Sequence, residues 1–398
     1  MMEVIGLLVA FAMIFVLRAK DVEFYVAITV AALIIGITSG KPMTILFDAL
    51  LMTLSDYATW NLVLAVALIT VLGYALKETG LMVHFIEGLS KVLPGNILLA
   101  TIPALFGFLS MPGGALMSAP FIEPEANKLG LDPDAKTYYN VWFRHLLYWV
   151  NPITSSTIMA VTLSGFAINQ WLLVQSPLFF VMTAIGFIAS RGFIKTPKKR
   201  GGAEGITREN LMGGIPILFT VVLTLLGFPI WGSLLAGILI AMILGRVKPK
   251  EGVLMFKNGV QINLALAIIS MLYLKDMIEA TGSVTSLFDV VIESGVPILA
   301  IAIVVPLFIG AISGSPAMGV GIAFPILLPL FGAPNIHLTS IVFLGITCTY
   351  ITSPLHLCLV LTNNYFKSDL NKVIKYLAPS SFALYLVGLA YHMFLYMF

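Results

Sequence analysis

The chain has 398 residues, of which 59% are hydrophobic and only 10% are charged. This composition indicates a polytopic membrane protein and excludes a large soluble domain, because spans of about 20 residues with short loops use up the chain. The formal net charge of +3 does not indicate a nucleic-acid partner, since the basic residues fall in predicted membrane loops. The expected surroundings are therefore the lipid bilayer.

Ten membrane-spanning helices are predicted, together with two kinds of shorter element. Short stretches with interleaved polar residues, at 81–93 and 283–293, are typical of amphipathic helices at the interface. Paired apolar stretches at 97–125 and 297–330 are each too short to cross a hydrocarbon core of about 30 Å, which favours re-entrant hairpins. The predicted spans lie at about 3–17, 24–39, 61–77, 137–164, 172–190, 211–227, 230–245, 261–275, 337–362 and 379–397.

Landmarks in the first half recur in the second about 200 residues later. They are Lys41-Pro42 and Lys248-Pro249, Thr79-Gly80 and Thr281-Gly282, Pro112 and Pro316, and Pro152 and Pro354. A fixed offset between several landmarks indicates an internal duplication. We expect repeat 1 at 1–192, a basic cytoplasmic linker at 193–207 and repeat 2 at 208–398. Five crossings per repeat is an odd number, so the two repeats should be inverted.

The distribution of basic residues predicts the orientation. Cytoplasmic loops of membrane proteins are rich in Lys and Arg. With both termini outside, only Lys41 and Lys275 of the 22 basic residues fall on the outer side, and Arg144 lies within a span. We therefore predict a multi-pass protein of the cell membrane, whose first hairpin enters from the cytoplasm and whose second enters from the exterior.

Four polar breaks interrupt the apolar segments, two at the hairpin tips and two inside the fourth and ninth spans. Proline frees backbone carbonyls, and such polar groups are tolerated at membrane depth only where they line an enclosed cavity. Half-helix N-termini at such breaks favour an anion such as a carboxylate. The predicted substrate-binding residues are Ser110, Pro112, Gly113, Gly114, Asn151, Pro152, Thr154, Ser313, Gly314, Ser315, Pro316, Thr352, Ser353 and His356. The alternative is a purely structural role, in which these residues serve helix packing and kinking.

Coupling ions have candidate ligands at the same breaks. Oxygen atoms of Ser110, Asn151, Ser155, Ser156, Ser315 and Thr352 are candidates for Na⁺ coordination, and no other cofactor is expected. His356 lies deep in a span, where an ionisable side chain is either a proton site or substrate ligand, or a neutral packed histidine. Arg144 either extends to the cytoplasmic surface or attracts an anion.

The chain lacks the sequence signatures of common enzymes. It has no H-E-x-x-H, P-loop or G-x-S-x-G motif and no pair of buried aspartates, so we predict that it is not an enzyme. No Asp or Glu falls in the centre of a predicted span, which disfavours a cationic substrate.

Two segments, at 110–120 (SMPGGALMSAP) and 142–152 (WFRHLLYWVNP), resemble an uncharacterised prokaryotic integral membrane family, a domain of unknown function. The order of elements resembles the ion transporter superfamily, which includes gluconate permeases, citrate transporters and divalent-anion sodium symporters. The resemblance implies an all-α, elevator-type transporter fold with two inverted five-span repeats, each containing a re-entrant hairpin and a broken helix. It further implies a mobile domain of hairpins and broken helices, and a scaffold of the remaining spans that forms a homodimer.

The predicted function is secondary active transport of a small organic anion coupled to Na⁺ or H⁺. A passive channel or facilitator for small anions is the first alternative, and a membrane scaffold or sensor without transport is the second. If the breaks bind substrate, replacing Asn151 or Ser315 by Ala should weaken binding without unfolding the protein.

Overall fold

The computed structural model describes residues 2–20, 22–108, 114–194, 207–283, 286, 293, 295–353 and 355–397, and this part of the chain is helical without a β-strand. The helices of the first half are α1 (Met2–Ala19), α2 (Phe24–Thr38), α3 (Ile45–Ser55), α4 (Tyr57–Glu78), α5 (Leu81–Val92), α6 (Gly95–Phe108), α7 (Gly114–Lys128), α8 (Pro133–Arg144), the 3₁₀ helix η1 (Leu146–Trp149), α9 (Ser155–Ser164) and α10 (Ile168–Ala189). The second half contains α11 (Arg208–Met212), α12 (Ile215–Leu225), α13 (Ile230–Leu244), α14 (Pro249–Gly259), α15 (Ile262–Thr281), α17 (Ile298–Ser313), α18 (Pro316–Leu330), α19 (Ile336–Thr352), α20 (Leu357–Phe366) and α21 (Leu370–Met397).

The length and composition of these helices make the chain a membrane protein. Within the described residues, four segments are long and apolar enough to cross a bilayer, namely α4, α10, α21 and the run 336–366, which comprises the interrupted helices α19 and α20. Helices α14 and α15, bent by 50° at their junction, give a fifth if they are counted as one span. Other predicted spans, such as α2 and α13, are shorter apolar helices. The bounds of α2 and α13 agree with the predicted spans at 24–39 and 230–245.

Two short helices, α3 and α14, were not predicted from the sequence. They follow Lys41-Pro42 and Lys248-Pro249 respectively, and both pack against α4. Each has 11 residues and lies between longer apolar helices, so its apolar side chains were assigned to loops. The predicted amphipathic segment at 81–93 is helix α5, whereas its counterpart at 283–293 falls almost entirely outside the described residues.

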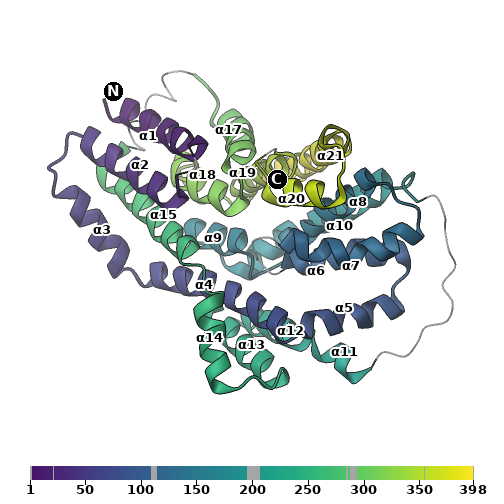
Figure 1. Ribbon diagram of the computed structural model, residues 1–398. Coiled ribbons are helices and arrows are strands. Elements are labelled where there is room, and N and C mark those ends of the chain that lie inside the picture. The colour runs from purple at the N-terminus through teal and green to yellow at the C-terminus, as the bar shows by residue number, and fades with distance from the viewer. Residues whose placement is uncertain are drawn as a thin grey trace.

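The helices form two packed groups (Figure 1). One group contains α1–α5 and α11–α15, and the other contains the hairpin helices α6, α7, α17 and α18, the interrupted helices α8, α9, α19 and α20, and also α10 and α21. The groups meet where α4 contacts α9, where α15 contacts α18, and where α5 contacts α6. The spans that correspond to α10 and α21 were expected to belong to the scaffold. Instead α10 packs on η1 and α21 packs on α19, so both lie with the hairpins and interrupted helices.

Hydrogen bonds of two buried side chains connect α8 to the C-terminal part of the chain. The Tyr138 hydroxyl lies 3.1 Å from the Ser380 hydroxyl, and the Thr137 hydroxyl lies 2.8 Å from that of Ser368. Tyr138 and Thr137 are fully buried. Polar side chains at such depth are accommodated by hydrogen bonding to one another, so these contacts hold the two halves of the chain together. Whether the halves are inverted repeats stays a prediction.

Candidate functional site

A cavity of about 350 Å³ lies between the two groups of helices. One wall comes from the first turns of α2 and α15, and the other from the interrupted helices and from the tip of the α17–α18 hairpin. The described residues that line it are Glu23, Phe24, Gly107, Arg144, Tyr148, Thr154, Ser155, Ser156, Gln261, Asn263, Leu264, Ala267, Gly314, Ser315, Pro316, Ala317, Met318, Tyr350, Leu357 and Cys358.

Three helices of the group of hairpins and interrupted helices begin at this cavity. Helix α9 starts after Thr154, whose hydroxyl accepts a hydrogen bond from the Thr157 amide at 3.3 Å. Helix α18 starts with a proline in its first turn after Ser315, and α20 starts after His356. The first amides of a helix lack intrahelical partners and carry partial positive charge, so the cavity wall is electrostatically suited to an anion.

At each break inside a span, one polar side chain forms a hydrogen bond to the hairpin helix beside it. Asn151, which is fully buried, donates from Nδ2 to the Phe108 carbonyl at 3.0 Å and accepts from the Ile153 amide at 3.0 Å. In the second half Ser353 does the same, because its hydroxyl donates to the Ala311 carbonyl and accepts from the Leu355 amide. These side chains give the Ile153 and Leu355 amides of the breaks a hydrogen-bond partner and connect each break to a carbonyl of the adjacent hairpin helix.

Glycines allow the hairpins to approach the interrupted helices closely. A Cβ atom at Gly107 would overlap the Arg144 carbonyl oxygen, and one at Gly310 would overlap the Ile346 carbonyl oxygen. Only a residue without a side chain permits such backbone contact. Both hairpins thus pack closely against α8 and α19, and the first contact lies at the cavity, which Gly107 and Arg144 line.

Arg144 is the basic residue of the cavity wall. It is only 5% exposed, so its side chain does not extend to the surface. The expectation that Arg144 extends to the cytoplasmic surface is therefore wrong. Glu23 is the only acidic residue among the described lining residues, and it is exposed. The buried part of the wall therefore has a positive charge and no described negative one.

The profile of a family described as "Protein of unknown function (DUF401)" matches residues 4–394. The chain belongs to the DUF401 family. None of the curated proteins matches the chain significantly in sequence. The crystal structure of the YdaH transporter from Alcanivorax borkumensis, which has an unusual topology, superimposes with a TM-score of 0.67 at 15% identity, over 94% of this chain and 98% of that one. At this identity the likeness shows that the DUF401 chain shares the fold of that transporter.

The structure brings only part of the predicted site to the cavity of the DUF401 protein. The predicted residues that line it are Thr154, Ser155, Ser156, Gly314, Ser315 and Pro316. Asn151, Pro152, Ser313, Thr352, Ser353 and His356 are not among its lining residues. Asn151 and Ser353 instead hold the hairpins, and the Thr352 hydroxyl donates to the Thr349 carbonyl at 3.1 Å. Ser110, Pro112 and Gly113 lie outside the described residues, and Gly114 is the first residue of α7.

Several lining residues of the DUF401 cavity were not predicted. Tyr148, Tyr350 and Cys358 flank the breaks but are apolar or weakly polar in character, and Gln261 and Asn263 come from the opposite helix group. Their proximity depends on tertiary packing, which no local pattern reports. The signal that could have identified Cys358 is its position two residues after His356.

Proposed function

We propose that this protein is a secondary active transporter that moves a small organic anion, such as a carboxylate, across the cell membrane. Two findings support the proposal: the fold is shared with a transporter, and a cavity lies between two packed groups of helices. We further propose that Na⁺ or H⁺ drives the transport, and that the protein works as a homodimer by an elevator mechanism.

The buried positive wall of the cavity is the observation that carries the choice of an anion. Arg144 and the first turns of α9, α18 and α20 line a volume of about 350 Å³, which is within the range of small-molecule sites. A guanidinium can bind a carboxylate through two parallel hydrogen bonds, and helix N-termini add donors for the same group. A cationic substrate would meet repulsion from every one of these groups.

The coupling ion has candidate positions at the same wall. The hydroxyls of Ser155, Ser156 and Ser315 line the cavity and provide the hard oxygen ligands that Na⁺ requires. His356 is fully buried behind this wall, beside Tyr350 and His145, where uptake of a proton would introduce an internal charge. We propose the serine hydroxyls for Na⁺ coupling and His356 for the alternative of H⁺ coupling.

An elevator mechanism needs one group of helices to slide past another with the substrate held in the moving one. The cavity residues that would bind the anion belong to the group of hairpins and interrupted helices, and the seam consists of α4 with α9 and α15 with α18. The exposed Glu23 and the first turn of α15 belong to the opposite wall, in the other group of helices. With both termini outside, as the basic residues predict, α2 and α15 begin on the cytoplasmic side.

A test combines ligand-induced stabilisation with uptake. The melting temperature of the purified protein is measured with monocarboxylates, dicarboxylates, sugar acids and amino acids, each with and without Na⁺ at pH 5.5 and 7.5. Binding to the folded state raises the melting temperature by mass action. Arg144→Gln should abolish the stabilisation by the best acid, whereas Arg191→Gln, which removes an exposed arginine, should leave it intact.

Proteoliposomes distinguish a carrier from a pore. A carrier loaded with unlabelled acid accelerates uptake of the labelled acid, and a passive channel does not. Stabilisation only in the presence of Na⁺ would identify sodium coupling, and stabilisation at low pH without Na⁺ would favour the proton. If no acid shifts the melting temperature and no counterflow occurs, the proposal of an organic-anion transporter is wrong.

A further inference from the structure

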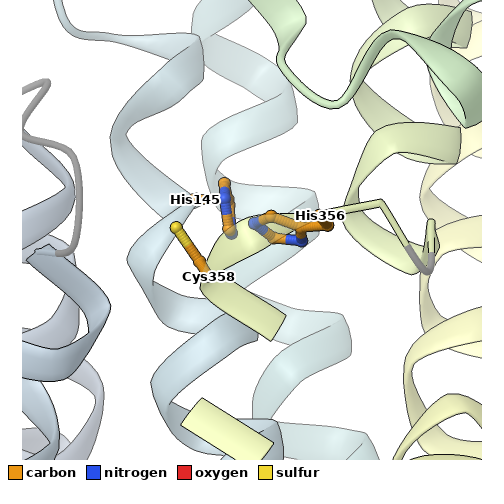
Figure 2. Close-up of side chains that lie close together, drawn as sticks. All are labelled: His145, His356 and Cys358. Atoms are coloured by element: carbon orange, nitrogen blue, oxygen red, sulfur yellow. The ribbon is translucent and has the colours of Figure 1, made fainter. Parts of the chain in front are cut away.

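Three side chains converge behind the cavity wall, and they come from both interrupted segments of the chain. His145 follows the last residue of α8, His356 precedes α20, and Cys358 lies in the first turn of α20. One ligand atom from each lies within 4.8 Å of the others, and the two imidazole centroids are 4.7 Å apart at a steep angle. Figure 2 shows the three side chains lying close together.

The hydrogen bonds of the two histidines define which ring nitrogen is protonated. His145 Nδ1 lies 2.6 Å from the Val141 carbonyl oxygen, and His356 Nδ1 lies 3.1 Å from the Ile351 carbonyl oxygen. A carbonyl oxygen only accepts, so each Nδ1 carries the proton and each Nε2 has a lone pair. Histidines that bind metals are commonly oriented by this same bond from the second nitrogen to a backbone carbonyl.

The two Nε2 atoms have no hydrogen-bond partner, although His145 is 1% exposed and His356 is fully buried. A buried polar atom without a partner is unfavourable and rare in folded proteins, and it requires an explanation. Here two such atoms and a thiol face one another, which is the arrangement expected if all three share a ligand that is an electron-pair acceptor.

We propose that His145 Nε2, His356 Nε2 and Cys358 Sγ bind one transition-metal ion of borderline or soft character, such as Zn²⁺. Imidazole nitrogen and thiolate sulfur are the preferred ligands of such ions, and three protein ligands leave one coordination position open. Bonds of about 2.1 Å to nitrogen and 2.3 Å to sulfur in a tetrahedral site require the three atoms to approach one another by up to about 1 Å.

The position of the cluster gives the ion a route of entry and a role. Cys358 also lines the cavity, whereas the two histidines lie behind it, so an ion can reach the site through the cavity. Arg144 lines the same wall and opposes a cation, and the negative charge of the bound thiolate offsets part of that repulsion. Ion binding would place additional positive charge beside the cavity, where it would strengthen the attraction for an anion. The metal site itself does not depend on the proposed transport function.

Binding of Co²⁺ to the metal-stripped, detergent-purified protein tests the proposal. Co²⁺ replaces Zn²⁺ in such sites, and its spectrum reports thiolate ligation through a charge-transfer band in the near ultraviolet. We expect one tightly bound ion per chain, displaced by Zn²⁺. Cys358→Ser should remove the charge-transfer band, and His145→Ala or His356→Ala should weaken binding by more than about tenfold, since loss of second-shell partners alone has effects of that size.

Two buried residues outside the cluster provide matched controls. Cys348 is the other cysteine, and His392 also has a buried Nε2 without a hydrogen-bond partner. Cys348→Ser and His392→Gln should leave the affinity and the spectrum unchanged. If wild type shows no charge-transfer band, or if Cys358→Ser retains it, the proposed site does not exist.

Alkylation of Cys358 provides a readout that does not require the histidine variants to fold. In the Cys348→Ser background, Zn²⁺ should slow the reaction of a maleimide with Cys358 by more than about tenfold, because a coordinated thiolate cannot attack. An alkylation rate independent of Zn²⁺ would overturn the proposal. Both measurements use metal ions alone as probes, so their outcome is independent of whether an organic anion is transported.

Discussion

Replacement of Asn151 by alanine tests the conclusion that this side chain holds the first hairpin. The variant loses the bond from Nδ2 to the Phe108 carbonyl and the bond from the Ile153 amide to Oδ1, each 3.0 Å long. Asn151 is fully buried, so water does not replace either bond without entering the packed break. We therefore expect Asn151→Ala to lower the stability of the protein. The sequence alone had led to a different expectation, that this variant weakens substrate binding without unfolding the protein.

The size of the effect follows from the two backbone groups that lose their partners. A buried donor or acceptor left unsatisfied costs about 1–3 kcal/mol. Two such groups give a free energy of unfolding lower by about 2–6 kcal/mol, reduced to the extent that the break relaxes. Asn169→Ala is the matched control, because Asn169 also donates to a backbone carbonyl, that of Leu225 at 3.1 Å, but is exposed.

Thermal unfolding in detergent, followed by tryptophan fluorescence, gives the comparison. We expect a clearly lower melting temperature for Asn151→Ala and no more than a small change for Asn169→Ala. Ser353→Ala, which removes the equivalent hydrogen bonds in the second half, should behave like Asn151→Ala. Equal melting of Asn151→Ala and wild type would refute the assignment of a structural role to this side chain.

Three further variants follow from single contacts. Gly107→Ala should lower the free energy of unfolding by about 1–3 kcal/mol, because the added Cβ would overlap the Arg144 carbonyl oxygen. Gly192→Ala is the control, since a Cβ there faces open space and should leave stability unchanged. Equal melting temperatures of the two variants would contradict the close approach at Gly107. Thr53→Val removes a 2.6 Å bond to the buried Asp276 carboxylate and should lower the free energy of unfolding by about 1.5–3 kcal/mol in chemical denaturation. Tyr365→Phe removes an exposed hydroxyl bonded to a carboxylate on α7 and should change stability by less than about 0.5 kcal/mol; a larger loss of melting temperature would show that this contact is stronger than its exposure indicates.

The breaks were predictable from sequence because their cause is local. Asn151-Pro152 cannot continue a helix, and Thr154 is a favourable residue to begin the next one, so the end of η1 and the start of α9 follow from neighbouring residues. The same reasoning identifies the second hairpin tip, where Gly314 has a positive φ of 67° and Pro316 opens α18.

Contacts between distant segments were not predictable in this way. Cys348 lies on α19 and Cys358 on α20, and Cys358 lies beside His145, which belongs to the other half of the chain. The buried Asp276 was also missed, because α15 extends six residues beyond the predicted span and its carboxylate is neutralised by Lys275 at 3.2 Å. Periodicity reports which face of a helix is apolar, but not which helix covers that face.

The hydrogen bonds that α8 forms with the C-terminal helices affect how the protein is made. Tyr138 is separated from its partner Ser380 by 242 residues, which takes about 12–48 s to translate at 5–20 residues per second. During that interval the Tyr138 and Thr137 hydroxyls are already in the nascent first half, but their partners are not yet synthesised. Insertion of the early helices must therefore precede their final packing, and the nascent half requires water, lipid headgroups or the insertion machinery to solvate these side chains until α20 and α21 arrive.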